Sequence, residues 1–375
     1  MTRIDRAFVG ARIHDGETLH EGAALVAGNG RFSVRPVEAL PDGCPTEHLN
    51  GGIIAPRFVD LQVNGGGGVM FNDDPSVESL HRIAQSHATT GTGAILPTLI
   101  TDTPIRTAGA IDAVERAIAE GVDGIAGLHL EGPHLSVARK GAHDGALIRK
   151  MEDDDLALLL HAADRIANIM VTVAPENVST AQIRAMADAG VVVSLGHTDA
   201  DMVTCLTAFD AGARCVTHLF NAMSPLGSRE PGLIGAVLTR GDIYAGLIAD
   251  GVHVNPTTIR VALAAKPHPE RVFLVTDAMA TAGSDITQFT LNGRQVYRRD
   301  NRLTLENGTL AGAHLDMPRA VSVMVDDVGE TEQNAIARAT SCPAALLREA
   351  GGSGRIDAAP SVVYLTERTA KVLSA

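Results

Sequence analysis

With 375 residues and a formal net charge of −13, the chain is 45 % hydrophobic but only 3 % aromatic. That composition predicts a soluble α/β protein with an aliphatic core, because a disordered chain would be poorer in Val, Ile and Leu. The negative charge argues against a nucleic-acid partner, yet it permits a small anionic substrate that senses only the field of its own pocket.

The first 54 residues predict short strands separated by turns. Apolar runs at 8–9, 23–26 and 32–34 flank the turn residues Asn29-Gly30, which is a hairpin signal. Residues 349–375 return to the same character, with a clear strand at 361–365. We therefore expect one small β-sandwich domain formed by both chain termini, residues 1–54 and 349–375.

Nothing in the sequence predicts export or membrane insertion. The N-terminal MTRIDRAFVG lacks the apolar core of a signal peptide, and no run approaches the roughly 18 apolar residues of a membrane span. Cys44, Cys205, Cys215 and Cys342 are scattered without a C-x-x-C pair, which favours reduced thiols. We expect a cytoplasmic protein with no membrane partner.

Residues 55–348 alternate apolar β-branched runs with helix-periodic stretches, the pattern of a parallel sheet. The predicted strands span 53–63, 94–98, 125–130, 169–174, 191–195, 215–219, 244–248 and 272–276, and predicted helices include 77–88, 105–119 and 181–189. Eight such units favour a closed (β/α)8 TIM-like barrel over an open sheet. The glycine run 65–68 is expected to be a loop.

Polar residues follow the predicted strands, where a barrel of this kind carries its active site. They are Gln62 and Asn64, then Thr98, Glu131, Glu176, His197, His218, His253 and Asp277. Two imidazoles and a carboxylate, here His197, His218 and Glu131, are a common catalytic zinc set with one position left for water. A bound divalent ion acidifies that water, and Asp277 remains as a separate acid/base.

Each of these residues has a structural interpretation when taken alone. A single His at a strand end is more often a hydrogen-bonded structural residue than a ligand. Glu131 alone could cap a helix, and Asp277 alone could be an N-cap. The joint pattern, four residues in phase with the β/α alternation, favours the metal site.

Seven motifs then make the chain resemble the N-acetylglucosamine-6-phosphate deacetylase family of the amidohydrolase superfamily. They are Gly127-Leu-His-Leu-Glu-Gly-Pro-His134, Lys140-Gly-Ala-His143, Ser194-Leu-Gly-His197, Thr217-His-Leu-Phe-Asn-Ala-Met223, Arg229-Glu-Pro-Gly232, Ala249-Asp-Gly-Val-His253 and Val275-Thr-Asp-Ala278. They occur in the family's order between about residue 55 and residue 315.

The resemblance implies hydrolysis of N-acetyl-D-glucosamine 6-phosphate to D-glucosamine 6-phosphate and acetate. Glu131, His197 and His218 would hold one divalent ion per subunit, Zn²⁺ or, with the same ligands, Fe²⁺. Asp277 would be the general base and acid for the metal-activated water, with His143 polarising the acetyl carbonyl. The implied sugar and phosphate contacts are Ala142, Asn221, Ala222, Arg229, His253, Leu310, Ala311 and Gly312, partly supplied by the neighbouring subunit of a homodimer.

Several positions depart from common patterns. Many amidohydrolases carry His-x-His on the first strand, whereas this chain has Gln62 and Asn64, and no lysine ends the fourth strand. Carboxamides are weak ligands, so we expect a single metal, with Gln62 and Asn64 hydrogen-bonding around it. The family's usual Pro-Gly-Phe is Pro56-Arg57-Phe58 here, so Arg57 would be strained if a left-handed φ were needed there.

Two alternatives remain open on the sequence. The enzyme could deacetylate another phosphorylated N-acetyl hexosamine, such as the galactosamine epimer, because the motifs say little about the sugar's C4 hydroxyl. The chain could also be an inactive amidohydrolase-fold binding protein, although all three ligands and Asp277 are present.

Overall fold

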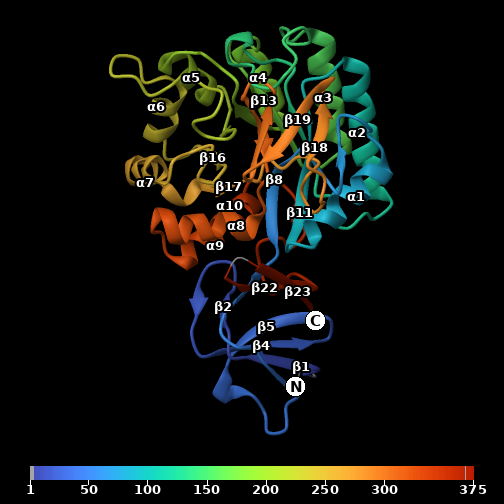
Figure 1. The fold of residues 1–375 in the computed structure, drawn as a ribbon, viewed down its shortest axis with the longest axis vertical. Helices are drawn as coiled ribbons and strands as arrows, with labels where there is room; N and C mark the ends of the chain where they lie inside the picture. Colours follow the sequence, from blue (N-terminus) through green and yellow to red (C-terminus); the bar gives the residue numbers. More distant parts are fainter. Residues whose placement is uncertain (1–3, 368) are drawn as a thin grey trace.

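The computed structural model describes residues 4–367 and 369–375. A barrel domain lies above a smaller β domain that contains both chain ends (Figure 1). Within the described residues, no helix is both long and apolar enough to cross a membrane.

Eight parallel strands form the nearly closed barrel predicted from the sequence. In sheet order they follow the chain: β8 (Phe58–Val63), β11 (Thr92–Ile100), β12 (Leu128–Glu131), β13 (Ile169–Val173), β14 (Val192–Leu195), β15 (Cys215–Val216), β16 (Tyr244–Leu247) and β17 (Val272–Leu274). Almost every residue of these strands is buried, because the strands are covered on both faces.

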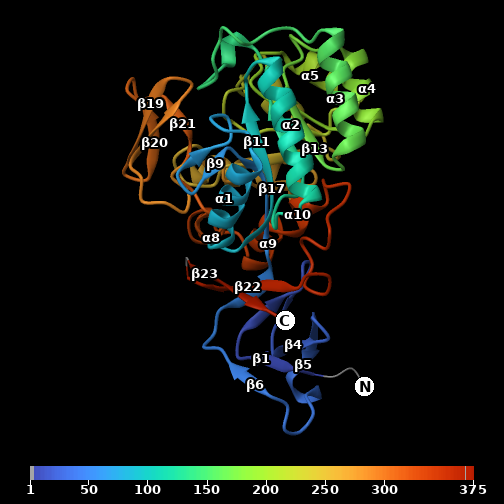
Figure 2. The same cartoon turned by 90° about the vertical axis from the view of Figure 1, so that its right-hand side faces the viewer.

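Helices connect consecutive strands and cover the outside of the barrel (Figures 1 and 2). They are α1 (Val77–Ala88), α2 (Pro104–Ala119), α3 (Asp153–Arg165), α4 (Thr180–Asp188), α5 (Met202–Asp210), α6 (Gly232–Thr239) and α7 (Pro256–Ala265), followed after β17 by α8 (Met317–Ser322), the π-helix η4 (Val323–Val328), α9 (Glu332–Ala339) and α10 (Ser341–Ala344). Short 3₁₀ turns lie at η1 (Val37–Ala39), η2 (Val137–Arg139) and η3 (Pro269–Arg271). Side-chain caps define where several helices begin: Ser76, Thr103 and Ser179 each accept a backbone N–H three residues on.

The seam between β8 and β17 lacks a regular ladder, and polar groups close it. The Asp60 carboxylate accepts hydrogen bonds from the hydroxyl and the backbone N–H of Thr276, the latter at 3.2 Å. Higher up, Asp277 N–H donates to Gln62 O at 3.0 Å, and Asn64 N–H donates to Ala278 O at 2.9 Å. The first and last strands therefore meet through residues of the barrel mouth.

The terminal domain contains two sheets around a shared apolar core, as expected for a sandwich. One sheet holds β5 (Arg31–Pro36), β4 (Ala23–Gly28), β1 (Arg6–Val9) and β6 (Thr46–His48), and the other holds β23 (Thr369–Ser374), β22 (Ser361–Thr366), β7 (Ile53–Pro56), β2 (Arg12–His14) and β3 (Leu19–His20). The β4–β5 hairpin turns at Asn29-Gly30, both with positive φ, as predicted.

Arg57 divides the strand that was predicted as one run over 53–63. The segment before it, β7, pairs with β2 and β22 of the terminal domain, and the segment after it, β8, enters the barrel. Arg57 is not among the residues with left-handed φ, so the strain considered above does not arise. Its Nη2 donates to Thr92 O at 2.6 Å, and its stem covers Gly93, where a Cβ would lie 2.6 Å from Arg57 Cβ.

Two small sheets at the barrel mouth were not predicted. The glycine run expected as a loop contains a short hairpin, β9 (Gly65–Gly66) with β10 (Val69–Met70). After β17 the chain forms a four-stranded antiparallel sheet, β18 (Gln288–Leu291), β19 (Arg294–Arg299), β20 (Arg302–Leu305) and β21 (Leu310–Ala313). This sheet projects from one side of the barrel domain (Figure 2) and lends residues to the mouth.

Candidate active site

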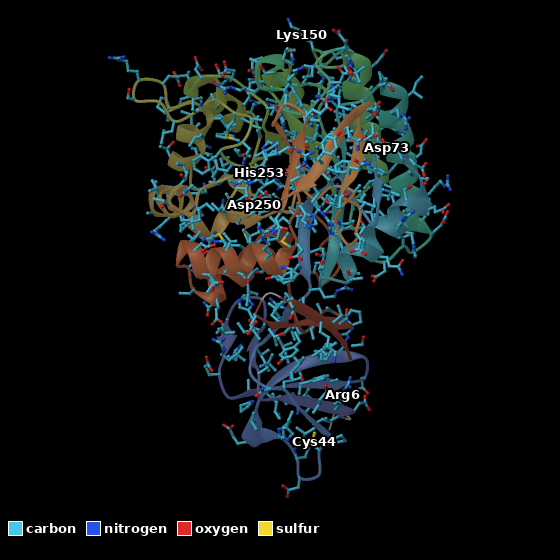
Figure 3. All side chains as sticks on the ribbon, viewed as in Figure 1. Arg6, Cys44, Asp73, Lys150, Asp250 and His253 are labelled. Atoms are coloured by element: carbon cyan, nitrogen blue, oxygen red, sulfur yellow. The ribbon has the colours of Figure 1, made fainter. Side chains whose placement is uncertain are left out.

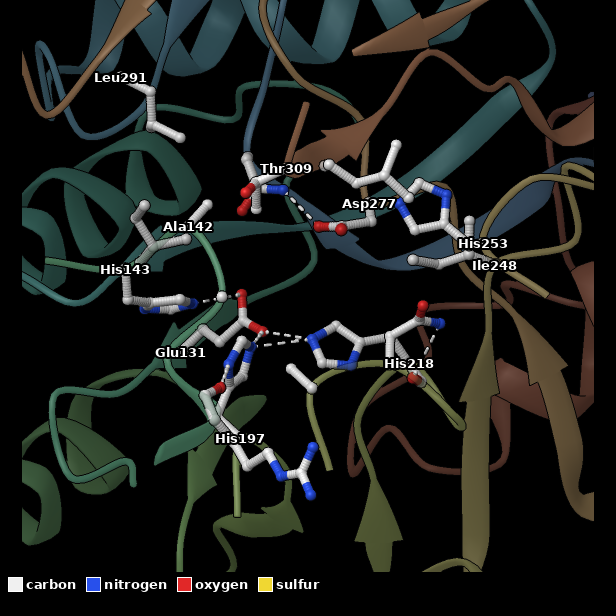
Figure 4. Close-up of a pocket in the computed structure, with 18 of the residues that line it drawn as sticks. Glu131, Ala142, His143, His197, His218, Ile248, His253, Asp277, Leu291 and Thr309 are labelled. Atoms are coloured by element: carbon white, nitrogen blue, oxygen red, sulfur yellow. Dashed lines mark hydrogen bonds and ion pairs between the residues drawn. The ribbon is translucent and has the colours of Figure 1, made fainter. Parts of the chain in front are cut away.

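Three side chains at the mouth sit on left-handed backbone just beyond their strands. The φ values are 47° at His197, 31° at His218 and 49° at Asp277. Non-glycine residues rarely adopt this conformation, and it is found where surrounding structure imposes it, often at functional sites. Here the backbone turns sharply as each strand ends, and the side chains face the centre of the mouth (Figure 4).

Glu131, His197 and His218 converge on one point. Glu131 Oε1 lies 3.1 Å from His197 Nε2 and 3.0 Å from His218 Nε2, and the two Nε2 atoms are 3.0 Å apart. All three residues are buried. Burial opposes ionisation of Glu131, but hydrogen bonds and charge from the two histidines outweigh it and lower its pKa.

This donor set fits a divalent metal ion. His197 Nδ1 donates to Arg139 O at 2.8 Å, so its Nε2 carries a lone pair toward the cluster. With both rings neutral and their Nε2 atoms unprotonated, two lone pairs and a carboxylate oxygen this close together would repel one another unless a cation lay between them. A tetrahedral ion with bonds of about 2.0–2.1 Å separates its ligand atoms by roughly 3.3 Å, close to the distances found here.

Asp277 faces the cluster from the seam and is held by two carboxamides. Asn64 Nδ2 donates to Asp277 Oδ1 at 2.6 Å, and Gln62 Nε2 lies 3.2 Å from the same oxygen and 3.3 Å from Glu131 Oε1. Burial and then the charge of Glu131 raise the pKa of Asp277 to about 6. The carboxamides of Gln62 and Asn64 are thus engaged with carboxylates.

His143 approaches from a third side, on the loop after β12. Its Nε2 lies 4.0 Å from Glu131 Oε2, and its ring packs edge-on against His197 with centroids 4.4 Å apart. Its Nδ1 lies 2.8 Å from Thr101 Oγ1. Burial lowers the pKa of His143 to about 3, so the ring is neutral at physiological pH.

A cavity of about 390 Å³ opens above these groups, within the usual range for small-molecule sites. Its walls include the predicted residues Asn64, Glu131, Ala142, His143, His197, His218, Asn221, Ala222, His253, Asp277, Leu310 and Gly312. Of the other predicted residues, Gln62 lies beneath the floor, and Ala311 is buried behind the wall with its side chain in an apolar cluster.

His253 and Arg229 differ in how the structure places them. His253 lines the cavity, and its Nδ1 donates to Asp250 Oδ2 at 2.7 Å; the two lie side by side within the barrel domain (Figure 3). Although burial opposes it, this bond lowers the pKa of Asp250. Arg229 is exposed on the loop before α6 and does not line this chain's cavity.

The four-stranded sheet β18–β21, called the mouth sheet below, holds the loop that carries His143. The Arg294 guanidinium, directly after the Asn292-Gly293 turn, donates to Ala142 O. Leu291, Thr309 and Leu310 of the same sheet line the cavity. The family resemblance pointed to Leu310, but sequence reasoning missed Leu291, Arg294 and Thr309 because the short strands of this wall lie outside the β/α alternation.

Thr98 is a correction with a simple cause. The second strand was predicted to end at 98 but continues to Ile100, so Thr98 lies inside the barrel wall, where its hydroxyl accepts Val63 N–H at 2.9 Å. Thr101 occupies the position just past the strand, and the same rule would have found it with the correct boundary. Glu176 accepts hydrogen bonds from the Thr198 hydroxyl and Asp199 N–H, away from the cluster.

Comparison with known proteins shows the family to which the chain belongs. The model of the amidohydrolase family matches residues 53–357, more than half of the chain, and the chain belongs to that family of hydrolases. An N-acetylgalactosamine-6-phosphate deacetylase of Shewanella sp. (strain ANA-3) is 42 % identical over 304 residues, 81 % of this chain and 76 % of the relative. An N-acetylglucosamine-6-phosphate deacetylase of Haemophilus influenzae is 35 % identical over 315 residues, 83 % and 81 % of the two chains.

The whole fold is shared with one of these enzymes. The crystal structure of N-acetylglucosamine-6-phosphate deacetylase from Pasteurella multocida has a TM-score of 0.91 and 34 % identity, covering 99 % of this chain and 100 % of that one. Within the amidohydrolases, the resemblance to N-acetylglucosamine-6-phosphate deacetylases drawn from the sequence motifs is therefore confirmed.

Proposed function

We propose that this protein hydrolyses N-acetyl-D-glucosamine 6-phosphate to D-glucosamine 6-phosphate and acetate. The observation that carries the proposal is the buried Glu131–His197–His218 cluster facing Asp277 across a cavity of small-molecule size. Relatives at 35 % identity that bear this activity in their names support it.

We assign the metal to Glu131, His197 and His218, one ion per subunit. Zn²⁺ is our first choice, with Fe²⁺ as the alternative that the same ligands accept. When bound, the ion polarises the acetyl carbonyl and acidifies a water molecule. Because Gln62 and Asn64 are already bonded to Asp277, we expect no second ion.

The remaining chemistry belongs to side chains. Asp277, as a carboxylate, accepts the proton of the attacking water and later delivers it to the amine nitrogen as the C–N bond breaks. His143 would donate a hydrogen bond from Nε2 to the carbonyl oxygen as negative charge develops there. Ala142, Asn221, Ala222, Leu310, Ala311 and Gly312 would position the sugar.

For the phosphate we propose His253 and Arg229, the latter from a neighbouring subunit. Arg229 is exposed and lies on the same surface loop as Leu226, which is 56 % exposed. This loop is therefore available to a second copy of the chain. A homodimer of this kind predicts complementation: mixing Arg229→Ala with Asp277→Asn subunits should restore activity in one site of each heterodimer. Two inactive variants that stay inactive after unfolding and refolding together would rule out the shared site.

A second substrate deserves equal testing, because the relative at 42 % identity acts on the galactosamine epimer according to its name. The experiment compares acetate release from N-acetylglucosamine 6-phosphate, N-acetylgalactosamine 6-phosphate and unphosphorylated N-acetylglucosamine, with bound metal quantified on the same sample. Preference for the first substrate with about one ion per chain supports the proposal. Preference for N-acetylgalactosamine 6-phosphate would make the galactosamine epimer the substrate. Failure to load any divalent ion would favour an inactive binding protein.

We also propose a cytoplasmic location. All four cysteines are free thiols, and burial raises the pKa of Cys205 and Cys342 to about 12 and of Cys215 to about 11. Fractionation of the native host's cells, followed by immunodetection, would test it.

A further inference from the structure

Thr101 contacts His143 at the ring nitrogen that points away from the cavity. It directly follows β11, is 1 % exposed and brings two groups to His143 Nδ1: its backbone N–H at 3.4 Å and its hydroxyl at 2.8 Å. The opposite nitrogen, Nε2, faces Glu131 and the cavity.

The backbone N–H shows which nitrogen of the neutral ring carries the proton, and the shorter contact with the hydroxyl holds the ring in that state. An N–H group can only donate, and this one donates to His143 Nδ1. If Nδ1 carried the proton, two N–H groups would face each other and this buried hydrogen bond would be lost, which is costly. The hydroxyl could then donate only to Glu131 O, at 3.5 Å.

We propose that Thr101 is a positioning residue that holds His143 in the tautomer with its proton on Nε2. That proton points into the cavity, where it can donate to the acetyl carbonyl oxygen during the deacetylation proposed above. In the other tautomer a lone pair would face the developing negative charge and oppose it. The number of protons on the ring is the same in both states; only their place differs.

Kinetics of three variants test the role. Thr101→Val removes the hydroxyl with little change in volume and should lower kcat about ten- to hundredfold with KM nearly unchanged. Thr101→Ser should restore most of the rate. Thr92→Val is the matched control, because Thr92 lies at the start of the same strand with a buried hydroxyl that has no partner.

If Thr101 acts through His143, its substitution should matter only when His143 is present. In a His143→Gln background, Thr101→Val should cause almost no additional loss. Full additivity of the two losses, or a Thr101→Val enzyme as fast as Thr92→Val, would overturn the proposal.

The tautomer can be measured without turnover. In ¹⁵N-histidine-labelled, zinc-loaded protein, the resonances of His143 are assigned by their loss in His143→Gln. We expect a protonated Nε2 and an unprotonated Nδ1 in the wild type, and a mixture in Thr101→Val. A protonated Nδ1 in the wild type refutes the proposal even if the valine variant does not fold, whereas a wild type that releases no acetate refutes the proposed function and leaves this measurement standing.

Discussion

Glu131 and Asp277 are buried carboxylates at the mouth of the same barrel, yet their surroundings drive their pKa values in opposite directions. Glu131 belongs to one arc of the mouth, formed by the ends of β12, β14 and β15. There the imidazoles of His197 and His218 lower its pKa. Asp277 belongs to the seam of β8 and β17, where burial and the charge of Glu131 raise its pKa to about 6. We propose that one arc binds a cation and that the other keeps a carboxylate free to exchange protons.

The largest effect should follow from removing the proton carrier of the seam. Asp277→Asn keeps the shape but cannot accept the water's proton, so kcat should fall about 10³- to 10⁴-fold while the metal content stays unchanged. Asp300→Asn is the matched control, since Asp300 shares the φ of 49° and is exposed in the β19–β20 turn. Substantial acetate release by the Asp277 variant would show that Asp277 is not the proton carrier, and the proposed difference between the two arcs would fail.

The ligand arc should respond in metal affinity instead. Glu131→Gln replaces the carboxylate with a neutral, weaker ligand, and we expect affinity for Zn²⁺ to fall more than about a hundredfold in competition with a chelator. Glu176→Gln serves as the control, because its carboxylate follows β13 on the same rim but accepts hydrogen bonds from Thr198 and Asp199 instead of facing the cluster. Equal zinc affinity in both variants would contradict the assignment of Glu131.

Asp60 extends the contrast down the seam and predicts a pH effect on stability. Burial raises its pKa from 3.8 to about 7, so the folded state binds more protons than the unfolded state between these values. The free energy of unfolding should therefore fall as pH rises through this window, by a few kcal/mol at most. Asp60→Asn should lack this decline, which thermal unfolding measured at a series of pH values between 4 and 8 will reveal. If the stability of the two proteins changes with pH in the same way, the prediction is wrong.

The smallest effect is expected at the opposite end of the barrel. Arg57→Gly removes the hydrogen bond to Thr92 O and a packed stem, so it should cost about 1–2 kcal/mol of stability. Because Arg57 lies at the start of β8, away from the mouth, kcat/KM should stay within about twofold of the wild type. Arg57→Lys, which keeps the charge and most of the stem, should lie between the two in thermal unfolding. A large loss of kcat/KM in the glycine variant would show that the two ends of β8 are coupled.

The sequence predicts best where periodicity and chemistry coincide. The eight strands, and the placement of Glu131, His197, His218 and Asp277 around one mouth, follow from apolar alternation and the rule for strand ends. The left-handed backbone at three of these residues does not, because nothing local in a His or Asp demands it. The ends of strands are also poorly defined by composition, which is why Thr98 was chosen in place of Thr101.

The mouth sheet was missed for another reason. Its strands carry Arg, Gln and Thr on exposed faces and bury only one or two side chains each, so their apolar pattern is weak. Arg294 consequently looks like any surface arginine until the fold brings it to Ala142. Long-range contacts of this kind depend on the tertiary arrangement and leave no local signal.

The closure of the barrel at β8 and β17 has an evolutionary consequence. The groups that join the two strands, Gln62, Asn64 and Asp277, are also those that would surround the reacting atoms in the proposed reaction. A lineage that exchanged either carboxamide for histidine, to recruit a second ion, would remake the join between its first and last strands in the same step. New chemistry on this scaffold therefore arises more readily through the mouth sheet and its loops, which can vary without reopening the barrel.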